Sequence, residues 1–359
     1  MGGLTRLRNL IARRPVAAAA TGSGAVGIAF LAATLALAGT AASAPTKPVA
    51  ATLRPIPATH LAVANGPLLD PFTGEPVSSL KPVLALKIDN IVYARPQTGL
   101  QSADLVYVIP VEGGLTRFLA VFSSHIPKVV GPVRSARESD LYILRQFGKP
   151  AFAWSGATPH LVPFIERAPI VDLYALLVNG YYRDPNRVAP YNLYANAPQL
   201  LREAKGASKA RDIGFRFGAL PAGGKTTASY SVKYPATSYD FRWSATAKRW
   251  LVSIDGKPEM ATEGRQLGPK TVIIQYTAIR TSRFLEYGGR PPIAETVGHG
   301  RAVILRDGKA YTVRWSRPSL ESGTTYTLPN GKRMLFAAGQ VWDVLAPDSH
   351  ASYMNAAAV

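Results

Sequence analysis

From residue 225 onward the sequence consists of short runs rich in β-branched and aromatic residues, and glycine-containing dipeptides separate several of them. Asp255-Gly256, Asp307-Gly308 and Asn330-Gly331 each favour a tight hairpin, because both positions of such a dipeptide tolerate positive φ. Runs joined in this way predict an all-β domain that forms a barrel or a curved sheet. We expect its strands at residues 230–234, 239–243, 250–254, 271–279, 301–305, 310–315, 333–337 and 341–345.

The part of the chain before this domain mixes strand-like and helix-like patterns. Glu112-Gly113-Gly114 lies between two apolar runs and predicts a hairpin, since paired glycines adopt positive φ at little cost. Ser135 is a candidate N-cap for the first helix. The expected fold class is α+β, with a mixed α/β first domain followed by the all-β second domain. In the first domain we expect strands at 83–88, 104–111, 115–122 and 151–154, and helices at 138–147, 159–167 and 198–205.

The N-terminus is typical of an export signal. Arg6, Arg8, Arg13 and Arg14 precede residues 15–46, which carry no charge and are mostly Ala, Val, Leu, Ile and Gly. This stretch exceeds the about 7–15 apolar residues of a cleaved signal and reaches the about 20 of a membrane span. Two alternatives stay open, an uncleaved anchor helix and a signal peptide cut near residues 38–44. Both place the bulk of the chain outside the cytoplasm.

The expected organisation follows from these segments. It comprises a signal peptide or membrane anchor at 1–44, a Pro/Ala-rich linker at 45–65, the mixed α/β domain at 66–218, the β-rich domain at 219–348 and a tail at 349–359.

The chain is strongly basic, with 41 Lys and Arg against 22 Asp and Glu and a formal charge of +19. Only 18% of its residues are charged and 47% are hydrophobic, which excludes a disordered basic protein. Four of the positive charges belong to the leader, so about +15 remains outside. Such a surface is attracted to an anionic wall polymer or a membrane surface. Nucleic acid is not an expected partner, because the compartment is wrong and aromatic and basic residues hardly interleave.

No metal ion or cofactor is expected. The absence of cysteine removes disulfides and thiolate ligands, and the five histidines are isolated, without the spacing of a zinc site. The glycine patterns of nucleotide-binding loops are missing as well.

The densest group of unusual residues lies between Leu86 and Arg137, where polar residues follow apolar strands. Arg134 and Arg137 flank Ser135-Ala136 just before the first expected helix. Guanidinium groups bind carboxylate or phosphate through two parallel hydrogen bonds, so this pair suggests a pocket for a small anion. The alternative is that each arginine pairs internally, with Asp89, Asp104, Glu112 or Asp140, and only supports the fold.

Glu112 and Asp89 are the best carboxylate pair and the only, weak, catalytic candidates. If their strands are neighbours, the two could meet at one end of a sheet, as a wall-active hydrolase that uses paired carboxylates requires. In the alternative interpretation Glu112 pairs with Arg117 across the hairpin. The tyrosines of 181–182 and 191–194 suit stacking against a sugar, or the packing of a proline-rich loop.

These residues resemble the YerB-like bacterial lipoproteins, a two-domain family of unknown function. The order and spacing of the segments match too, from about residue 66 to 347, and the resemblance implies a protein on the outer side of the cytoplasmic membrane with no established activity. One departure is the missing lipid-bearing cysteine. The matching segments are Lys-Ile-Asp-Asn (87–90), Ala-Arg-Pro-Gln-Thr-Gly-Leu (94–100), Ala-Asp (103–104), Glu-Gly-Gly-Leu-Thr-Arg-Phe (112–118), Gly-Pro-Val-Arg-Ser-Ala-Arg (131–137), Pro-Tyr-Asn-Leu-Tyr (190–194) and Gly-Gln-Val-Trp (339–342).

The function expected is that of a binding or accessory protein of the cell envelope, with a cleft in the first domain for a small anionic or sugar ligand. The alternative is the hydrolase that uses Glu112 and Asp89. The expected ligand-binding residues are Asp89, Asn90, Glu112, Arg117, Arg134, Ser135, Arg137 and Asn192.

Overall fold

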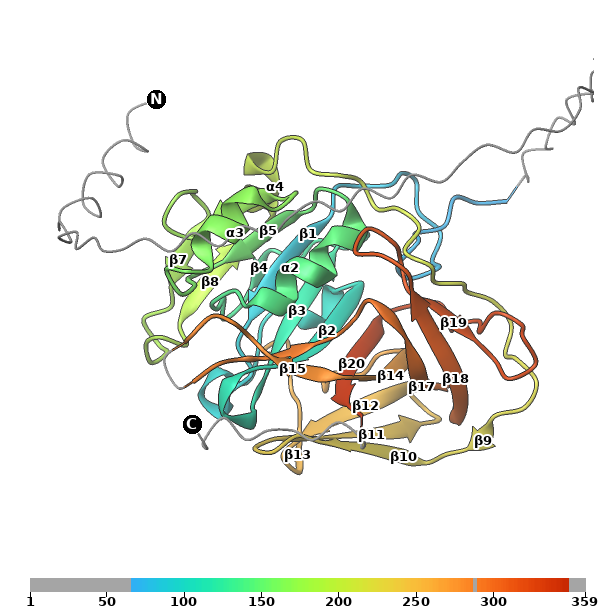
Figure 1. Ribbon diagram of the computed structural model, residues 1–359. Coiled ribbons are helices and arrows are strands. Elements are labelled where there is room, and N and C mark those ends of the chain that lie inside the picture. Colours follow the sequence, from blue (N-terminus) through green and yellow to red (C-terminus); the bar gives the residue numbers. More distant parts are fainter. Residues whose placement is uncertain (1–65, 287–288, 349–359) are drawn as a thin grey trace, which may run out of the picture. The chain divides into compact units, whose positions relative to one another are not determined.

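The computed structural model describes residues 66–286 and 289–348, which form a two-domain α+β fold built on open sheets (Figure 1). The expected leader, the linker and the tail after residue 348 lie outside the described residues. Within the described part, no helix is both long and apolar enough to cross a membrane.

The first domain contributes five strands to an 11-stranded sheet, in the order β2-β3-β1-β5-β6. The predicted hairpin is confirmed: β2 and β3 are antiparallel, and Gly113 between them has a φ of 73°. β1 is antiparallel to β3 and parallel to β5. Every residue of β1, β2, β3 and β5 is buried, because both faces of this part of the sheet are covered. The strands are β1 (Leu84–Ile88), β2 (Leu105–Pro110), β3 (Thr116–Phe122), β5 (Ala151–Trp154) and β6 (Val171–Tyr174).

Five strands of the second domain extend the same sheet. They follow the order β19-β18-β17-β14-β20, and the last strand, β20, lies between β14 and β2 and is parallel to both (Figure 1). The sheet is therefore open, so of the two expected forms, a barrel or a curved sheet, the barrel does not form. The strands are β14 (Thr271–Thr277), β17 (Gly298–Arg306), β18 (Lys309–Arg317), β19 (Thr325–Thr327) and β20 (Val341–Pro347), and the short β9 (Lys225–Thr226) pairs with β18.

A four-stranded antiparallel sheet covers one face of the large sheet near the junction of the domains. Its Phe241 packs edge-on against Trp342 of β20, which in turn contacts Phe118 of β3. One apolar core thus joins residues from both domains. The four strands are β10 (Ser229–Lys233), β11 (Ser238–Ser244), β12 (Arg249–Ile254) and β13 (Lys257–Pro258).

Helices cover both faces of the first domain's part of the sheet. α2 (Glu138–Leu144), continued by η4 (Arg145–Phe147), and α3 (Val162–Arg167) pack on one face, and α4 (Ala197–Glu203) packs on the other. Shorter elements complete the fold. They are η1 (Val92–Ala94), η2 (Leu100–Ser102), η3 (Glu112–Gly114), β4 (Val129–Val130), β7 (Tyr181–Arg183), β8 (Leu193–Asn196), β15 (Ile279–Thr281) and β16 (Pro292–Ala294).

Two local expectations are wrong. Ser135 does not cap α2: the helix begins at Glu138, its N-cap is Arg137, and the Arg137 N–H donates to Asp140 over 2.7 Å. Residues 333–337 form no strand, because the segment makes single bridges to two different partners, Arg333 to Thr327 and Phe336 to Phe217.

Candidate functional site

Seven of the eight expected ligand-binding residues lie at one end of the large sheet. β1 and β2 both end there and β3 begins there, because each is antiparallel to β3. Asp89 therefore follows β1, Glu112 follows β2 and Arg117 opens β3, while the segment from Arg134 to Arg137 crosses the same end before α2. The condition set for Asp89 and Glu112 to meet, that their strands be neighbours, is not fulfilled, because β3 lies between β1 and β2, but both strands finish at the same end of the sheet.

The charged members of this group form interlocking ion pairs. Arg134 Nε lies 2.7 Å from Asp89 Oδ2. Arg137 contacts both carboxylate oxygens of Glu112, with 2.9 Å between its Nε and Oε2. Arg117 lies beside this pair, with its Nη2 3.7 Å from Glu112 Oε1 and its Nη1 donating to the Ser135 carbonyl over 3.3 Å.

A fully buried ion pair supports the cluster. Lys87 Nζ lies 2.7 Å from Asp140 Oδ1, and both side chains have 0% exposure. Burial lowers the pKa of Lys87, whereas the Asp140 carboxylate opposes that effect. Because Asp140 also accepts the N–H of Arg137, this one carboxylate links β1, the loop before α2 and α2 itself.

The electrostatics of Glu112 argue against a role as general acid. Burial alone would raise its pKa, but the hydrogen bonds and charge of Arg137, with the charge of Arg117, bring it down to about 2. A carboxyl group with this pKa holds no proton to donate at neutral pH. Burial and the neighbouring Arg137 in turn lower the pKa of Arg117 to about 10. The geometry thus favours the interpretation of Glu112 and Arg137 as an internal ion pair.

Asn90 and Asn192 also make internal hydrogen bonds. The Asn90 amide donates to Thr116 Oγ1 over 3.1 Å and contacts the hydroxyl of Tyr239 in the second domain. Asn192 accepts from Arg183 Nη1 over 2.7 Å and donates to the Asp184 carbonyl, so it closes the β7–β8 hairpin instead of joining the cluster.

Aromatic rings lie at the solvent side of the cluster. Tyr191 stacks on Tyr93 with ring centroids 5.9 Å apart, and the Arg134 guanidinium lies 5.5 Å from the Tyr191 ring centroid. Tyr93 is 71% exposed. This stacked pair is an aromatic surface beside the cluster, and sugar binding there stays a prediction.

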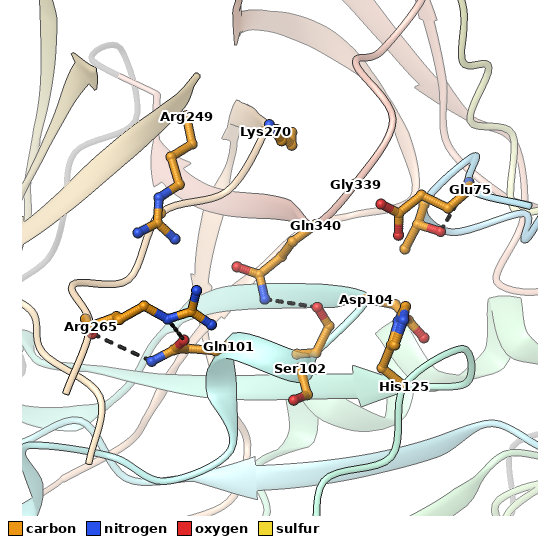
Figure 2. A pocket seen from close by; sticks show the side chains of 13 residues that line it. Glu75, Gln101, Ser102, Asp104, His125, Arg249, Arg265, Lys270, Gly339 and Gln340 are labelled. Atoms are coloured by element: carbon orange, nitrogen blue, oxygen red, sulfur yellow. Dashed lines mark hydrogen bonds between the residues drawn. The ribbon is translucent and has the colours of Figure 1, made fainter. Parts of the chain in front are cut away.

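A pocket of about 300 Å³ opens elsewhere on the molecule, between segments of both domains (Figure 2). Arg249 and Arg265 reach towards it from one side, and Glu75 and His125 line the opposite side. None of the eight expected ligand-binding residues lines it. Its lining comprises Thr73, Glu75, Gln101, Ser102, Ala103, Asp104 and His125 from the first domain, and Arg249, Arg265, Gly268, Lys270, Gly339 and Gln340 from the second.

Gln340 connects the two domains at the floor of this pocket. Its Nε2 donates to the carbonyls of Leu100 and Ala103 over 2.8 and 2.7 Å, and its Oε1 accepts from Trp342 Nε1 over 3.0 Å. The preceding Gly339 has a φ of 122°, and a Cβ there would lie 2.6 Å from Lys270 Cγ. The Gly-Gln-Val-Trp segment (339–342) therefore belongs to this site, and the sequence analysis had already singled it out. Nothing in its local sequence indicates that it contacts residues 100–103.

The rim of the pocket carries more positive than negative charge. Arg265 Nε donates to Gln101 Oε1 over 3.1 Å and Lys270 Nζ donates to the Lys248 carbonyl over 3.0 Å. Within residues 66–286 and 289–348, the Arg249 guanidinium makes no hydrogen bond or ion pair. The pocket thus contains an arginine fork whose donors remain available to a ligand.

Asp104 and Glu75 are the two carboxylates of the lining, and Asp104 is largely satisfied by its own neighbours. It accepts hydrogen bonds from Ser123 and from the N–H and hydroxyl of Ser124, whose Oγ lies 2.8 Å from His125 Nδ1. Burial raises the pKa of Asp104 to about 7, so it is only partly ionised at neutral pH. Among the described residues, no group of three or more His, Cys, Asp or Glu is placed to hold a metal ion.

Known proteins resemble this chain over most of its length. Residues 72–211 match the N-terminal domain, and residues 230–342 the C-terminal domain, of a protein of unknown function, DUF3048. A relative named "Putative lipoprotein YerB", from Bacillus subtilis (strain 168), is 26% identical over 302 residues, or 81% of this chain and 88% of the relative.

The fold is also that of a solved structure. The crystal structure of YerB protein from Bacillus subtilis superposes with a TM-score of 0.66 at 23% identity, covering 78% of this chain and 97% of that one. Both domain matches, in the same order, agree with the segments on which the resemblance was first based. The chain therefore belongs to the YerB-like family of two-domain DUF3048 proteins.

Proposed function

We propose that this protein is an extracytoplasmic binding protein of the cell envelope, and that the pocket between its two domains binds an anionic group of a wall polymer. The observation that carries the proposal is the Arg249 guanidinium, which has no partner in the described part of the chain although it lines a pocket. Unpaired guanidinium groups recognise phosphate or carboxylate through two parallel hydrogen bonds.

The neighbours of Arg249 fit the same ligand chemistry. Arg265 and Lys270 each use one hydrogen bond internally and keep further N–H donors, while Gln101 and Ser102 provide polar groups that position a ligand. A volume of about 300 Å³ corresponds to roughly ten water molecules at ~30 Å³ each. This volume suits one phosphorylated or carboxylated repeat unit, with the remaining polymer outside.

The predicted location outside the cytoplasm also favours an anionic wall polymer as the ligand. The charge-free stretch after four leader arginines predicts export, and the Bacillus subtilis relative bears the name "Putative lipoprotein YerB". The formal charge of about +15 left after those arginines attracts an anionic polymer before the pocket binds it.

The hydrolase alternative has less support. It requires Glu112 or Asp89 to exchange a proton with a substrate, yet Arg137 occupies both oxygens of Glu112 and Arg134 binds Asp89. Incubation of the protein with a peptidoglycan digest tests this alternative directly, and we expect no turnover.

Titration calorimetry of the full chain with a synthetic glycerol phosphate oligomer tests the proposed binding. We expect saturable binding that weakens as salt rises. Arg249→Gln removes the positive charge and the second of the two parallel N–H donors that a guanidinium offers to an anion. Loss of one hydrogen bond to a charged group costs about 1.5–3 kcal/mol. The dissociation constant should therefore rise at least about tenfold.

The exposed Arg314 of β18 does not line the pocket and provides the matched control, Arg314→Gln. This variant has the same change of charge and should bind as the unmodified protein does. Equal binding by Arg249→Gln and Arg314→Gln would disprove the assignment of the pocket.

A further inference from the structure

A second pocket, of about 250 Å³, lies between the helices of the first domain and a loop of the second. Leu161 and Phe284 are buried in its lining, and the rings of Phe164 and Phe284 contact each other with centroids 5.1 Å apart. Leu141 of α2 and Leu320 of the second domain complete an apolar interior. This lining differs in kind from the polar pocket of Figure 2.

Two arginines without acidic partners lie at this apolar pocket. The Arg283 guanidinium is 4.4 Å from the ring centroid of Phe164 and 4.9 Å from that of Phe284, and the Arg167 guanidinium is 4.9 Å from that of Phe164. Neither arginine forms an ion pair with any carboxylate of residues 66–286 or 289–348. Stacking on a ring orients a guanidinium but leaves its N–H edges free to bind an anion.

The acidic residue of this lining, Glu138, is already occupied. Glu138 accepts hydrogen bonds from the hydroxyls of Tyr142 and Ser282 and lies 3.8 Å from Arg280. A third arginine of the lining, Arg145, is paired with Glu321. The net charge available to a ligand at this pocket is therefore that of Arg167 and Arg283.

An apolar interior beside two arginines that have no acidic partner in the described part of the chain favours a ligand that is both apolar and anionic. A free phosphate ion would leave the partly exposed Leu141, Phe164 and Leu320 in contact with water, and an uncharged amphiphile would leave both guanidinium groups unused. We propose that this pocket binds the anionic end of a lipid, with its phosphate or carboxylate at Arg167 and Arg283 and the start of its chain against Phe164 and Phe284.

The size of the pocket and its surroundings agree with that occupant. A volume of about 250 Å³ equals roughly eight water molecules at ~30 Å³ each, which suffices for the first few methylene groups of one chain. Leu285, next to Phe284, is 61% exposed and adds apolar surface beside the pocket.

The test uses amphiphiles dissolved below their micelle concentration, so that the apolar leader of the full chain has no bilayer to enter. Titration calorimetry compares dodecyl phosphate, dodecyl maltoside and inorganic phosphate. We expect saturable binding of dodecyl phosphate and at least tenfold weaker binding of the other two. Equal binding of dodecyl maltoside would refute the role of the arginines, and equal binding of inorganic phosphate would refute that of the apolar lining.

Variants then locate the binding. Arg167→Gln and Arg283→Gln change exposed residues, and each should weaken dodecyl phosphate about tenfold, while Ala168→Phe fills the pocket without changing charge and should also weaken it. Arg314→Gln should have no effect, and neither should Arg249→Gln, which belongs to the other pocket. Unchanged affinity in Arg167→Gln, Arg283→Gln and Ala168→Phe would overturn the proposal. A loss confined to Arg249→Gln would overturn it as well and place the probe in the polar pocket.

Discussion

Replacement of Glu112 by glutamine tests whether the charged cluster at the end of the sheet supports the fold. The side chains of Glu112 and Arg137 are 13% and 6% exposed, so little water screens their ion pair. Although burial alone would raise it, the two arginines lower the pKa of Glu112 from the ordinary 4.5 to about 2. At about 1.4 kcal/mol per pKa unit, the ionised carboxylate contributes about 3 kcal/mol to the free energy of unfolding.

The pH dependence follows from the direction of this shift. Because the folded protein holds the carboxylate more strongly ionised than the unfolded chain does, the contribution is complete above pH 4.5 and is lost as the pH falls towards 2. Glu112→Gln should therefore unfold more easily by about 3 kcal/mol at pH 7. The difference from the unmodified protein should shrink progressively below pH 4.

Urea denaturation followed by tryptophan fluorescence measures the free energy of unfolding at pH 7 and its change at lower pH. Urea is uncharged and therefore does not screen the ion pairs. The control is Glu321→Gln, which removes the carboxylate of an exposed pair with Arg145 and should leave the urea midpoint nearly unchanged. Full stability of Glu112→Gln at pH 7 would refute the ion-pair interpretation. Such a result would also leave Glu112 available to a ligand or substrate.

Three further changes probe other parts of the fold. Lys87→Met leaves Asp140 buried without its cation and should lower the free energy of unfolding by about 3–5 kcal/mol, measured by the same urea titration; a loss below 1 kcal/mol would contradict this. Asp343 is buried on β20, and burial raises its pKa from 3.8 to about 8, so the stability added by its protonated form is complete below about pH 4 and is lost progressively as the pH rises to 8; Asp343→Asn should flatten the thermal unfolding profile between pH 4 and 8, and an unchanged profile would contradict that pKa. Gln340→Ala leaves the carbonyls of Leu100 and Ala103 without their donor, and the thermal midpoint should fall together with affinity for the glycerol phosphate oligomer; loss of neither would show that Gln340 is dispensable at the floor of the pocket.

Local patterns predicted the elements of this fold well. The two glycines after Glu112 produced the hairpin of β2 and β3, and the Asp-Gly turn at Asp307 produced that of β17 and β18, because such turns depend only on adjacent residues. The partner of β20 could not be predicted in this way. Val341 pairs with both Leu105 and Thr271, and no local signal specifies partners so distant in the chain.

The candidate site, like the fold, could be predicted from the sequence only in part. The placement of polar residues at strand ends suggested that Asp89 and Glu112 could meet if their strands were neighbours, but β3 lies between those strands. Whether the charged side chains line a pocket or form ion pairs depends on distances such as the 2.7 Å between Arg134 Nε and Asp89 Oδ2. A sequence pattern cannot supply such distances. The sequence analysis did not predict the polar pocket, because Arg249 is one of many basic residues in the sequence. Only the structure shows that its guanidinium makes no hydrogen bond or ion pair within the described residues.

The position of β20 has a consequence for how the chain acquires its structure. During synthesis from the N-terminus, β2 is made long before residues 341–347. Until β20 is available, the edge of β2 that pairs with it in the folded protein stays unpaired. Pairing at such separation is slow, because a long loop must close first. We therefore expect that a chain ending before residue 341 aggregates, and that the two domains acquire their native form in a single late event.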